Sequence, residues 1–185
     1  MWNKFIASPI VRVALRYGAI SGALVLVFLL SLYYMDKHPF LVNPFLDPRI
    51  PVLGLMLFFG LKELRDFYQS GALYFGQGMV TTFLVTLLCA SLSWCGIVAF
   101  ASLDGNFVTS FITQTTEQTR SFTTEDIERI GRGTFEESLA QLQKADKYFM
   151  AGRYFFQTFI ISFFISLIVT VILRRAPVEE PGMKG

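Results

Sequence analysis

The chain has 185 residues, of which 53% are hydrophobic and only 16% are charged, and its formal net charge is +2. A soluble domain carries about 25% charged residues, so these values and a mean hydropathy of +0.50 exclude a soluble globular fold, a disordered chain and a disulfide scaffold. The small net charge also argues against binding to nucleic acid. We therefore expect an integral membrane protein that forms a single membrane domain over residues 1–185.

Apolar segments long enough to cross the membrane occur at residues 13–35, 76–103 and 152–174. Each meets the roughly 20 residues that a helix needs to cross a hydrocarbon core about 30 Å thick. The segment 50–68 has a shorter apolar part and ends in charged residues, but the long stems of Lys and Arg can carry that charge to the lipid headgroups. We therefore expect an all-α fold with four transmembrane helices. The alternative is three spans with one re-entrant segment.

Basic residues beside the spans predict the orientation, because short span-adjacent clusters of Lys and Arg stay in the cytoplasm. Such clusters precede the first span, follow the second and follow the last, although the loops on the other side carry as many basic residues in total. Both termini are therefore expected in the cytoplasm. The clusters are Lys4, Arg12 and Arg16, then Lys62 and Arg65, and finally Arg174, Arg175 and Lys184.

The first connection, residues 36–49, contains three prolines, which lack a backbone donor and break helices. Apolar residues lie between them, so we expect this segment to lie on the membrane surface. It also holds His38, the one histidine of the chain, which could form a metal site only with neighbours such as Asp36 and Asp47. Because a single histidine is a weak signal, we expect no metal site here.

The second connection begins with the most densely charged stretch next to lipid, which includes Lys62, Arg65 and Asp66. Lys62 and Asp66 are four residues apart and can pair on one helical face. We expect this interfacial charged turn to end a short span and to fix its topology. Binding of lipid headgroups or of a cytoplasmic partner is the alternative.

The third connection, residues 104–151, is the only long polar part of the chain and predicts a helical extracytoplasmic insert before the last span. Asn106 can cap a first short helix, and Thr123 or Thr124 can start a second. The glycines around Arg132 then interrupt the helical pattern.

The residues after 134 predict an amphipathic arm. From position 135 no proline occurs before position 177, and apolar residues recur every three or four positions, which is the spacing of one helical face. One helix over about residues 135–174 would leave its first half outside the bilayer; a separate interfacial helix with a bend at Gly152 is the alternative. The apolar face of the arm consists of Phe135, Leu139, Leu142 and Phe149.

Small residues recur every four positions on the first and last predicted spans, and Ser91, Cys95 and Ala99 form a similar stripe on the third. In lipid, close approach of small residues and side-chain hydrogen bonds contribute more to helix packing than hydrophobic burial does. We expect these stripes to pack the four helices against one another, and docking of a partner is the alternative. The stripes comprise Ala14, Gly18 and Gly22 on the first span and Thr158, Ser162, Ser166 and Thr170 on the last.

Motifs for catalysis and cofactor binding are missing from the sequence. Three predicted spans have no ionisable side chain near their centres, although such groups usually mark proton or substrate paths. No phosphate-binding loop, dinucleotide motif or Ser-His-Asp set occurs. Cys89 and Cys95 are six residues apart on one helix, so they face different directions and cannot form a disulfide. We therefore expect no enzymatic activity, no cofactor and no metal.

The stretch GLKELRDFYQSGALYFGQGM at residues 60–79 resembles a signature of the domain of unknown function family 4199. In this family Gly-x-Lys-x-x-Arg-Asp follows the second span, and a Gly and a Phe-Gly open the third. The resemblance implies four spans, a helical polar insert and a location in the inner membrane of Bacteroidota, and it brings no assigned activity. The matching positions are Gly60, Lys62, Arg65, Asp66, Gly71, Phe75 and Gly76, whereas Gln77 stands where many members carry Lys.

These observations favour a non-catalytic accessory or scaffold subunit of a bacterial inner-membrane complex, in contact with membrane lipid. It would dock a membrane-protein partner, or a second copy of itself, through the small-residue helix faces and the amphipathic arm. The alternative is a homo-oligomeric channel or small transporter, in which the hydroxyl stripe that begins at Thr158 would line the pore.

Overall fold

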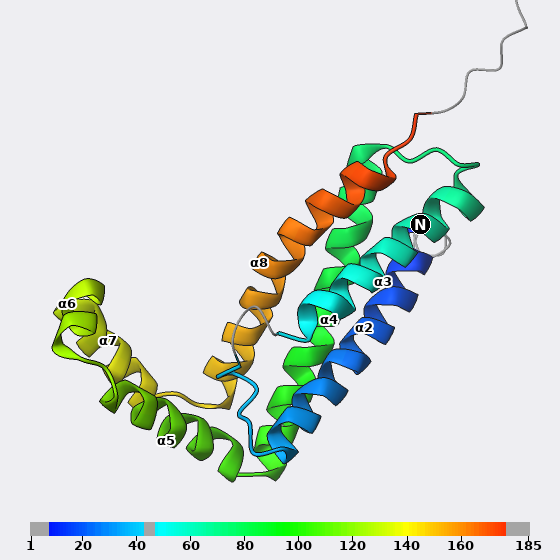
Figure 1. Cartoon of the computed structure of the whole chain (residues 1–185). Coiled ribbons are helices and arrows are strands. Elements are labelled where there is room, and N and C mark those ends of the chain that lie inside the picture. The colour runs from blue at the N-terminus through cyan, green and yellow to red at the C-terminus, as the bar shows by residue number, and fades with distance from the viewer. Residues whose placement is uncertain (1–7, 43–46, 177–185) are drawn as a thin grey trace, which may run out of the picture.

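The computed structural model describes residues 8–42 and 47–176, and this part of the chain contains helices and no strand. Figure 1 shows four of these helices side by side in a bundle. They are α2 (Pro9–Tyr34), α3 (Arg49–Glu63), α4 (Phe75–Leu103) and α8 (Lys147–Leu173). Lys4 and Lys184, two of the basic residues that predict the orientation, lie outside the described residues.

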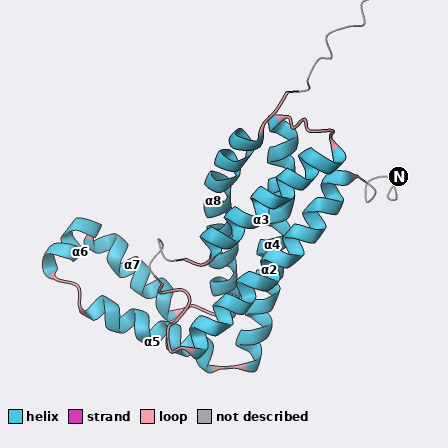
Figure 2. Ribbon diagram, turned by 45° about the vertical axis from the view of Figure 1, so that its right-hand side comes forward, coloured by secondary structure: helices cyan, strands magenta, loops and turns pink. Residues whose placement is uncertain are grey.

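Three shorter helices form an arm that leaves one end of the bundle sideways, as both Figure 1 and Figure 2 show. They are α5 (Asn106–Arg120), α6 (Thr124–Ile130) and α7 (Arg132–Gln143). We call this end of the bundle the arm end. The opposite end, where α2 begins and α8 ends, is the terminal end.

Helices α2, α4 and α8 are long and apolar enough to cross a membrane, and their length and composition are those of a helical membrane protein. Helix α3 is shorter, because its 15 residues rise only about 22 Å. It continues directly into a π-helical turn, η2 (Leu64–Tyr68). The predicted segment 50–68 is thus helical, while its crossing of the membrane stays a prediction.

The first small-residue stripe lies where α2 approaches α4 most closely. A Cβ atom added to Gly18 would lie 2.7 Å from the Cβ atom of Leu88, and one added to Gly22 would lie 2.8 Å from a methyl carbon of Leu92. Ala14 is buried in the same stripe. The absence of side chains at these glycines lets the two backbones approach, which is how small residues stabilise helix pairs in lipid.

The hydroxyl stripe of α8 is buried inside the bundle. Thr158, Ser162, Ser166 and Thr170 are each at most 4% exposed, and α8 packs against α4 and α3. Ser162 hydrogen-bonds to Thr86 of α4, and Thr170 contacts Gly78 of the same helix. These side chains therefore join helices of one chain.

The arm and the last bundle helix are separate helices, so the prediction of one helix over residues 135–174 is wrong. Helix α7 ends at Gln143 and α8 begins at Lys147. The break follows from local chemistry, because an Asp146 carboxylate oxygen accepts the backbone N–H of Phe149 at 2.7 Å and so starts a new helix. Gly152, the position of the bend in the alternative prediction, lies within helix α8.

In the part of the first connection at residues 36–42, Asp36 and Lys37 are exposed, but the residues that follow pack onto the bundle. His38 is only 3% exposed, and Phe40 and Leu41 pack against the main hydrophobic cluster. The apolar residues of this segment are therefore used inside the protein and are not spread on lipid. Pro44, Phe45 and Leu46 lie outside the described residues.

Candidate functional site

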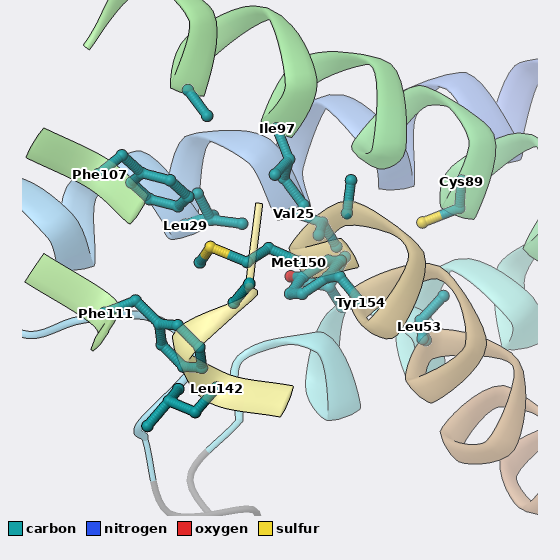
Figure 3. Packing of buried hydrophobic residues seen from close by; sticks show 14 residues of the cluster. Val25, Leu29, Leu53, Cys89, Ile97, Phe107, Phe111, Leu142, Met150 and Tyr154 are labelled. Carbon is teal, nitrogen blue, oxygen red and sulfur yellow. The ribbon is translucent and has the colours of Figure 1, made fainter. Parts of the chain in front are cut away.

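The largest hydrophobic cluster lies at the arm end and joins the arm to the bundle. Figure 3 shows Met150 of α8 between Leu29 of α2, Phe107 of α5 and Tyr154 of α8. Phe111 and Leu142 extend the cluster into the arm.

A buried ion pair lies at the start of α3, beside this cluster. The Arg49 side chain is 4% exposed and pairs with Asp47, whose side chain is 11% exposed. The Arg49 Nε atom lies 2.9 Å from both carboxylate oxygens, and Asp47 also accepts the backbone N–H of Arg49 at 2.9 Å. Two residues on either side of a proline thus form a compact, bidentate pair.

The remaining donors of Arg49 reach helix α8. Its Nη1 atom lies 3.3 Å from the Thr158 hydroxyl oxygen and 3.5 Å from the Tyr154 carbonyl oxygen. The guanidinium carbon lies 4.0 Å from the centre of the Tyr154 ring, as in a cation–π contact. The guanidinium therefore clamps the start of α3 to the third turn of α8.

This clamp was not predicted from the sequence. Asp47 was considered only as a distant metal candidate with His38 and Asp36, and Arg49 only as the end of a loop. The sequence signal is two opposite charges around Pro48, immediately before an apolar helix. Because removing one member of a buried pair leaves an uncompensated charge, the clamp has a structural role.

His38 is the second buried polar group at the arm end. Its Nε2 atom lies 3.2 Å from the Phe107 carbonyl oxygen, and its Nδ1 atom accepts the backbone N–H of Phe40 at 3.3 Å. A carbonyl oxygen only accepts hydrogen bonds, so Nε2 carries the proton and the ring is neutral. Burial lowers the pKa of His38 to about 4, although its hydrogen bond to Phe107 acts in the opposite direction.

A groove of about 330 Å³ runs between α5, α7 and the first turns of α8. Hydroxyl and amide groups of Thr115, Thr119, Ser138 and Gln141 lie along it, and Arg153 stands at its α8 side. Its volume is in the range of small-molecule and anchor-residue sites. The apolar lining consists of Phe111, Phe122, Phe135, Leu139, Leu142 and Phe149.

The four predicted residues of the arm face all line this groove, but they differ in exposure. Leu142 is 8% exposed and belongs to the main cluster, whereas Phe149 is 42% exposed. Phe135 and Leu139 are half-buried. The arm thus uses one end of its apolar face to attach itself and leaves the other end uncovered.

The interfacial charged turn lies at the terminal end, far along α3 from the groove. The Asp66 carboxylate pairs with the adjacent Arg65, so the expected pairing of Asp66 with Lys62 was wrong. Lys62 is exposed on the last turn of α3. Glu63 is bound instead by Arg16 and by the Tyr17 hydroxyl, 2.9 Å away, which ties α3 to α2.

Chemistry-bearing side chains do not converge elsewhere in the described parts of the chain. Between residues 8 and 176, leaving aside positions 43–46 and the side chains of residues 126 and 130, no three His, Cys, Asp or Glu residues are placed to hold a metal ion. Cys89 is buried and Cys95 is exposed, and both are free thiols. The candidate site is therefore the groove, together with the His38 contact behind its α5 wall.

Comparison with known proteins gives one match. A family model with the description "Protein of unknown function (DUF4199)" matches residues 16–175. No curated protein and no solved structure matches the chain.

Proposed function

We propose that this chain, which belongs to the DUF4199 family, is a non-catalytic accessory or scaffold subunit of a bacterial inner-membrane complex. In this proposal α3 and η2 together form a fourth span, both termini are cytoplasmic and the arm is extracytoplasmic. The support is the placement of Lys62, Arg65, Arg174 and Arg175 at the terminal end of the bundle, as the positive-inside rule favours.

The observation that carries the proposal is the uncovered groove of the arm. The small-residue stripes of α2 and α8 are buried between helices of the same chain, so they build the bundle and leave no free face for docking. Beside the groove, Phe122 of the arm is 43% exposed and Phe149 of α8 is 42% exposed. Aromatic side chains around a pocket are typical anchor positions in protein interfaces.

The proposed occupant is a segment of a partner membrane protein that inserts apolar side chains into the groove. Arg153 is exposed at the α8 side of the groove and takes part in none of the ion pairs between described residues. A carboxylate on the partner would complement it, because Arg binds carboxylates in a bidentate way.

A pair of substitutions tests this function. Leu139→Glu places a charge among the apolar groove residues, while Ala140→Glu adds the same charge at an exposed position of the same helix. Leu142 is unsuitable, because its burial in the main cluster would confuse docking with folding.

The measurement is quantitative mass spectrometry of proteins that copurify with natively expressed chain in mild detergent. We expect Leu139→Glu to lower the ratio of partner to chain by about tenfold or more, since burying an unpaired carboxylate costs several kcal/mol. Ala140→Glu should leave the ratio unchanged. Retention of the full complex by the Leu139 variant, or a reproducible absence of any partner, would contradict the proposal.

The alternative of a homo-oligomeric channel receives no support from the hydroxyl stripe. A pore lining must face a common axis of several copies, whereas Thr158, Ser162, Ser166 and Thr170 are buried within one bundle. We therefore carry only the subunit function forward.

A further inference from the structure

Two buried side chains, Phe107 and Phe111, attach helix α5 to the bundle, and the partly buried Val108 and Ile112 pack against the same cluster. Both phenylalanines pack on the same neighbours, His38 and Phe40 of the first connection. The His38 ring centre lies 5.0 Å from that of Phe107 and 5.2 Å from that of Phe111. His38 therefore forms a large part of the surface on which α5 rests.

Phe111 connects this contact to the groove. It stacks on His38 on one side and lines the groove on the other, opposite residues of α7 and α8. A movement of α5 away from His38 would remove one wall of the groove. The contact thus lies directly behind the site at which the partner is proposed to bind.

We propose that His38 is a pH-sensitive latch, which holds α5 and the groove wall in place while its ring is neutral and releases them when the ring is protonated. The proposal concerns regulation of the groove, and only its consequence for partner binding rests on the proposed function.

The hydrogen bonds of His38 leave no place for a second proton. Nε2–H donates to the Phe107 carbonyl oxygen, and Nδ1 accepts from the Phe40 N–H. A proton on Nδ1 would face this N–H donor, so protonation removes one hydrogen bond and adds a buried charge. Protonation of the ring therefore favours a state in which the contact has opened.

The groups around His38 do not compensate such a charge. From α2, the Tyr33 ring faces His38 edge-on and donates its hydroxyl to Asp104 at 2.8 Å. Tyr34 and Asp36 share with His38 a polar pocket of about 240 Å³, which Ser110 and Gln114 of α5 complete.

Towards α8, Phe40 lies between His38 and Tyr154, and Tyr154 in turn contacts Arg49 of the Arg49–Asp47 pair. Asp36 is exposed, and no described hydrogen bond or ion pair joins it to His38.

The direction and size of the effect follow from proton linkage. The pKa of His38 is about 4 in the closed state and returns to about 6.5 when the ring reaches water. The open state therefore binds more protons between these values, and the opening constant of α5 should rise about 30-fold from about pH 8 to about pH 5.

Hydrogen exchange of the full chain in detergent measures this opening. Backbone amides of α5, corrected for the intrinsic pH dependence of exchange, should show the 30-fold rise in the wild-type chain. His38→Gln keeps an amide that can donate to the Phe107 carbonyl but cannot titrate, so α5 of this variant should show no rise. An equal rise in both proteins, or no rise in the wild type, would overturn the latch.

A second measurement covers the case in which His38→Gln fails to fold. His38 is the only histidine, so its ring signal in a ¹³C NMR titration of the wild-type chain is unambiguous. The latch requires a midpoint clearly below the ordinary value of about 6.5 in the folded protein, and a midpoint at about 6.5 would overturn it. His38→Asn, which keeps an acceptor near the Nδ1 position, serves as the second non-titrating variant.

Partner retention separates the latch from the proposed function. With both correct, the dissociation constant of the partner rises from pH 8 to pH 5 in the wild-type chain by the factor that the open fraction of α5, measured by hydrogen exchange, requires, and it stays constant in His38→Gln. A partner affinity that does not change while hydrogen exchange shows that most α5 helices are open at pH 5 would support the latch and show that the groove is not the docking site. A pH-independent α5 with loss of partner in Leu139→Glu would support the docking function and overturn the latch.

Discussion

Two arginines at the arm end of the molecule differ in burial and in the number of their hydrogen-bond partners. Arg49 is buried, and its Nε, Nη1 and Nη2 atoms all reach acceptors on Asp47 and on α8. Arg153 immediately precedes Tyr154 on α8, yet its side chain is exposed beside the groove, which the described residues leave open.

This difference separates polar groups that find their partners within the chain from those that are left without one at the groove. Lipid offers no hydrogen-bond partners, so a membrane bundle must satisfy its polar groups internally, as the Arg49 clamp does. The arm leaves both an apolar lining and a cation uncovered. A function that depends on binding is therefore expected at the arm, and stability is expected to depend on the clamp.

The largest expected effect separates the two arginines directly. Arg49→Ala should lower the free energy of unfolding by about 3–5 kcal/mol, because Asp47 would remain buried without its partner. Arg153→Ala should change it by less than about 0.5 kcal/mol, as is usual for exposed positions. Denaturation of both variants in detergent, followed by circular dichroism, measures the difference.

A double variant sharpens this prediction. Asp47→Leu combined with Arg49→Met should recover most of the lost stability, since an apolar pair of similar volume often replaces a buried ion pair without loss. Equal stability losses for Arg49→Ala and Arg153→Ala would break the comparison.

The next effect is the pH dependence of stability. The folded-state pKa of His38 is lowered to about 4 from 6.5, so its neutral form is favoured by folding. Its contribution is complete above about pH 6.5 and is lost as the pH falls towards 4, by at most about 3 kcal/mol. Unfolding free energies of the wild-type chain and His38→Gln across this range should diverge only below about pH 6.5.

A smaller effect concerns the packing of α2 on α4. Gly18→Ala brings a Cβ atom within 2.7 Å of Leu88 and 3.0 Å of the Val85 carbonyl oxygen, and overpacking of this kind costs about 1–3 kcal/mol. Gly54→Ala is the matched control, because no atom lies within 4 Å of its added Cβ. Melting temperatures that fall equally in both variants would show that steric contact is not the cause.

The smallest effect is expected at the interfacial charged turn. Asp66 and Arg65 are adjacent and lie at the exposed terminal end of α3, where ion pairs contribute little. Asp66→Asn should leave the melting temperature in detergent unchanged within error. A clear drop in the melting temperature of Asp66→Asn would show that this turn makes a stabilising contact, contrary to the expectation that stability depends on the Arg49 clamp.

Much of the fold was predictable because it depends on local sequence. Long apolar runs specify α2, α4 and α8, since each can satisfy its backbone within one helix, and the structure contains three such helices. The breaks around α6 were predictable too, because Gly131 adopts a positive φ of 92° that glycine allows at little cost.

The sequence-based predictions were wrong where contacts with distant segments, or a single capping side chain, outweighed the local hydrophobic pattern. Residues 36–42 look like a surface segment, but His38 and Phe40 gain more by packing against Phe107 and Phe111. The prediction of a continuous helix after residue 134 did not take account of Asp146, whose carboxylate caps α8. A periodic apolar pattern continues through such a break, since it records which face is buried and not where the backbone restarts.

The sequence by itself determined that this chain is a helical membrane protein with an amphipathic arm, because length and hydrophobic periodicity act within single helices. Only the tertiary structure decided that Asp47 and Arg49 clamp α3 to α8, that His38 supports α5, and that the arm residues surround a groove. Each of these features joins residues far apart in the chain, and its stability comes from desolvation and contacts that exist only after the helices have packed.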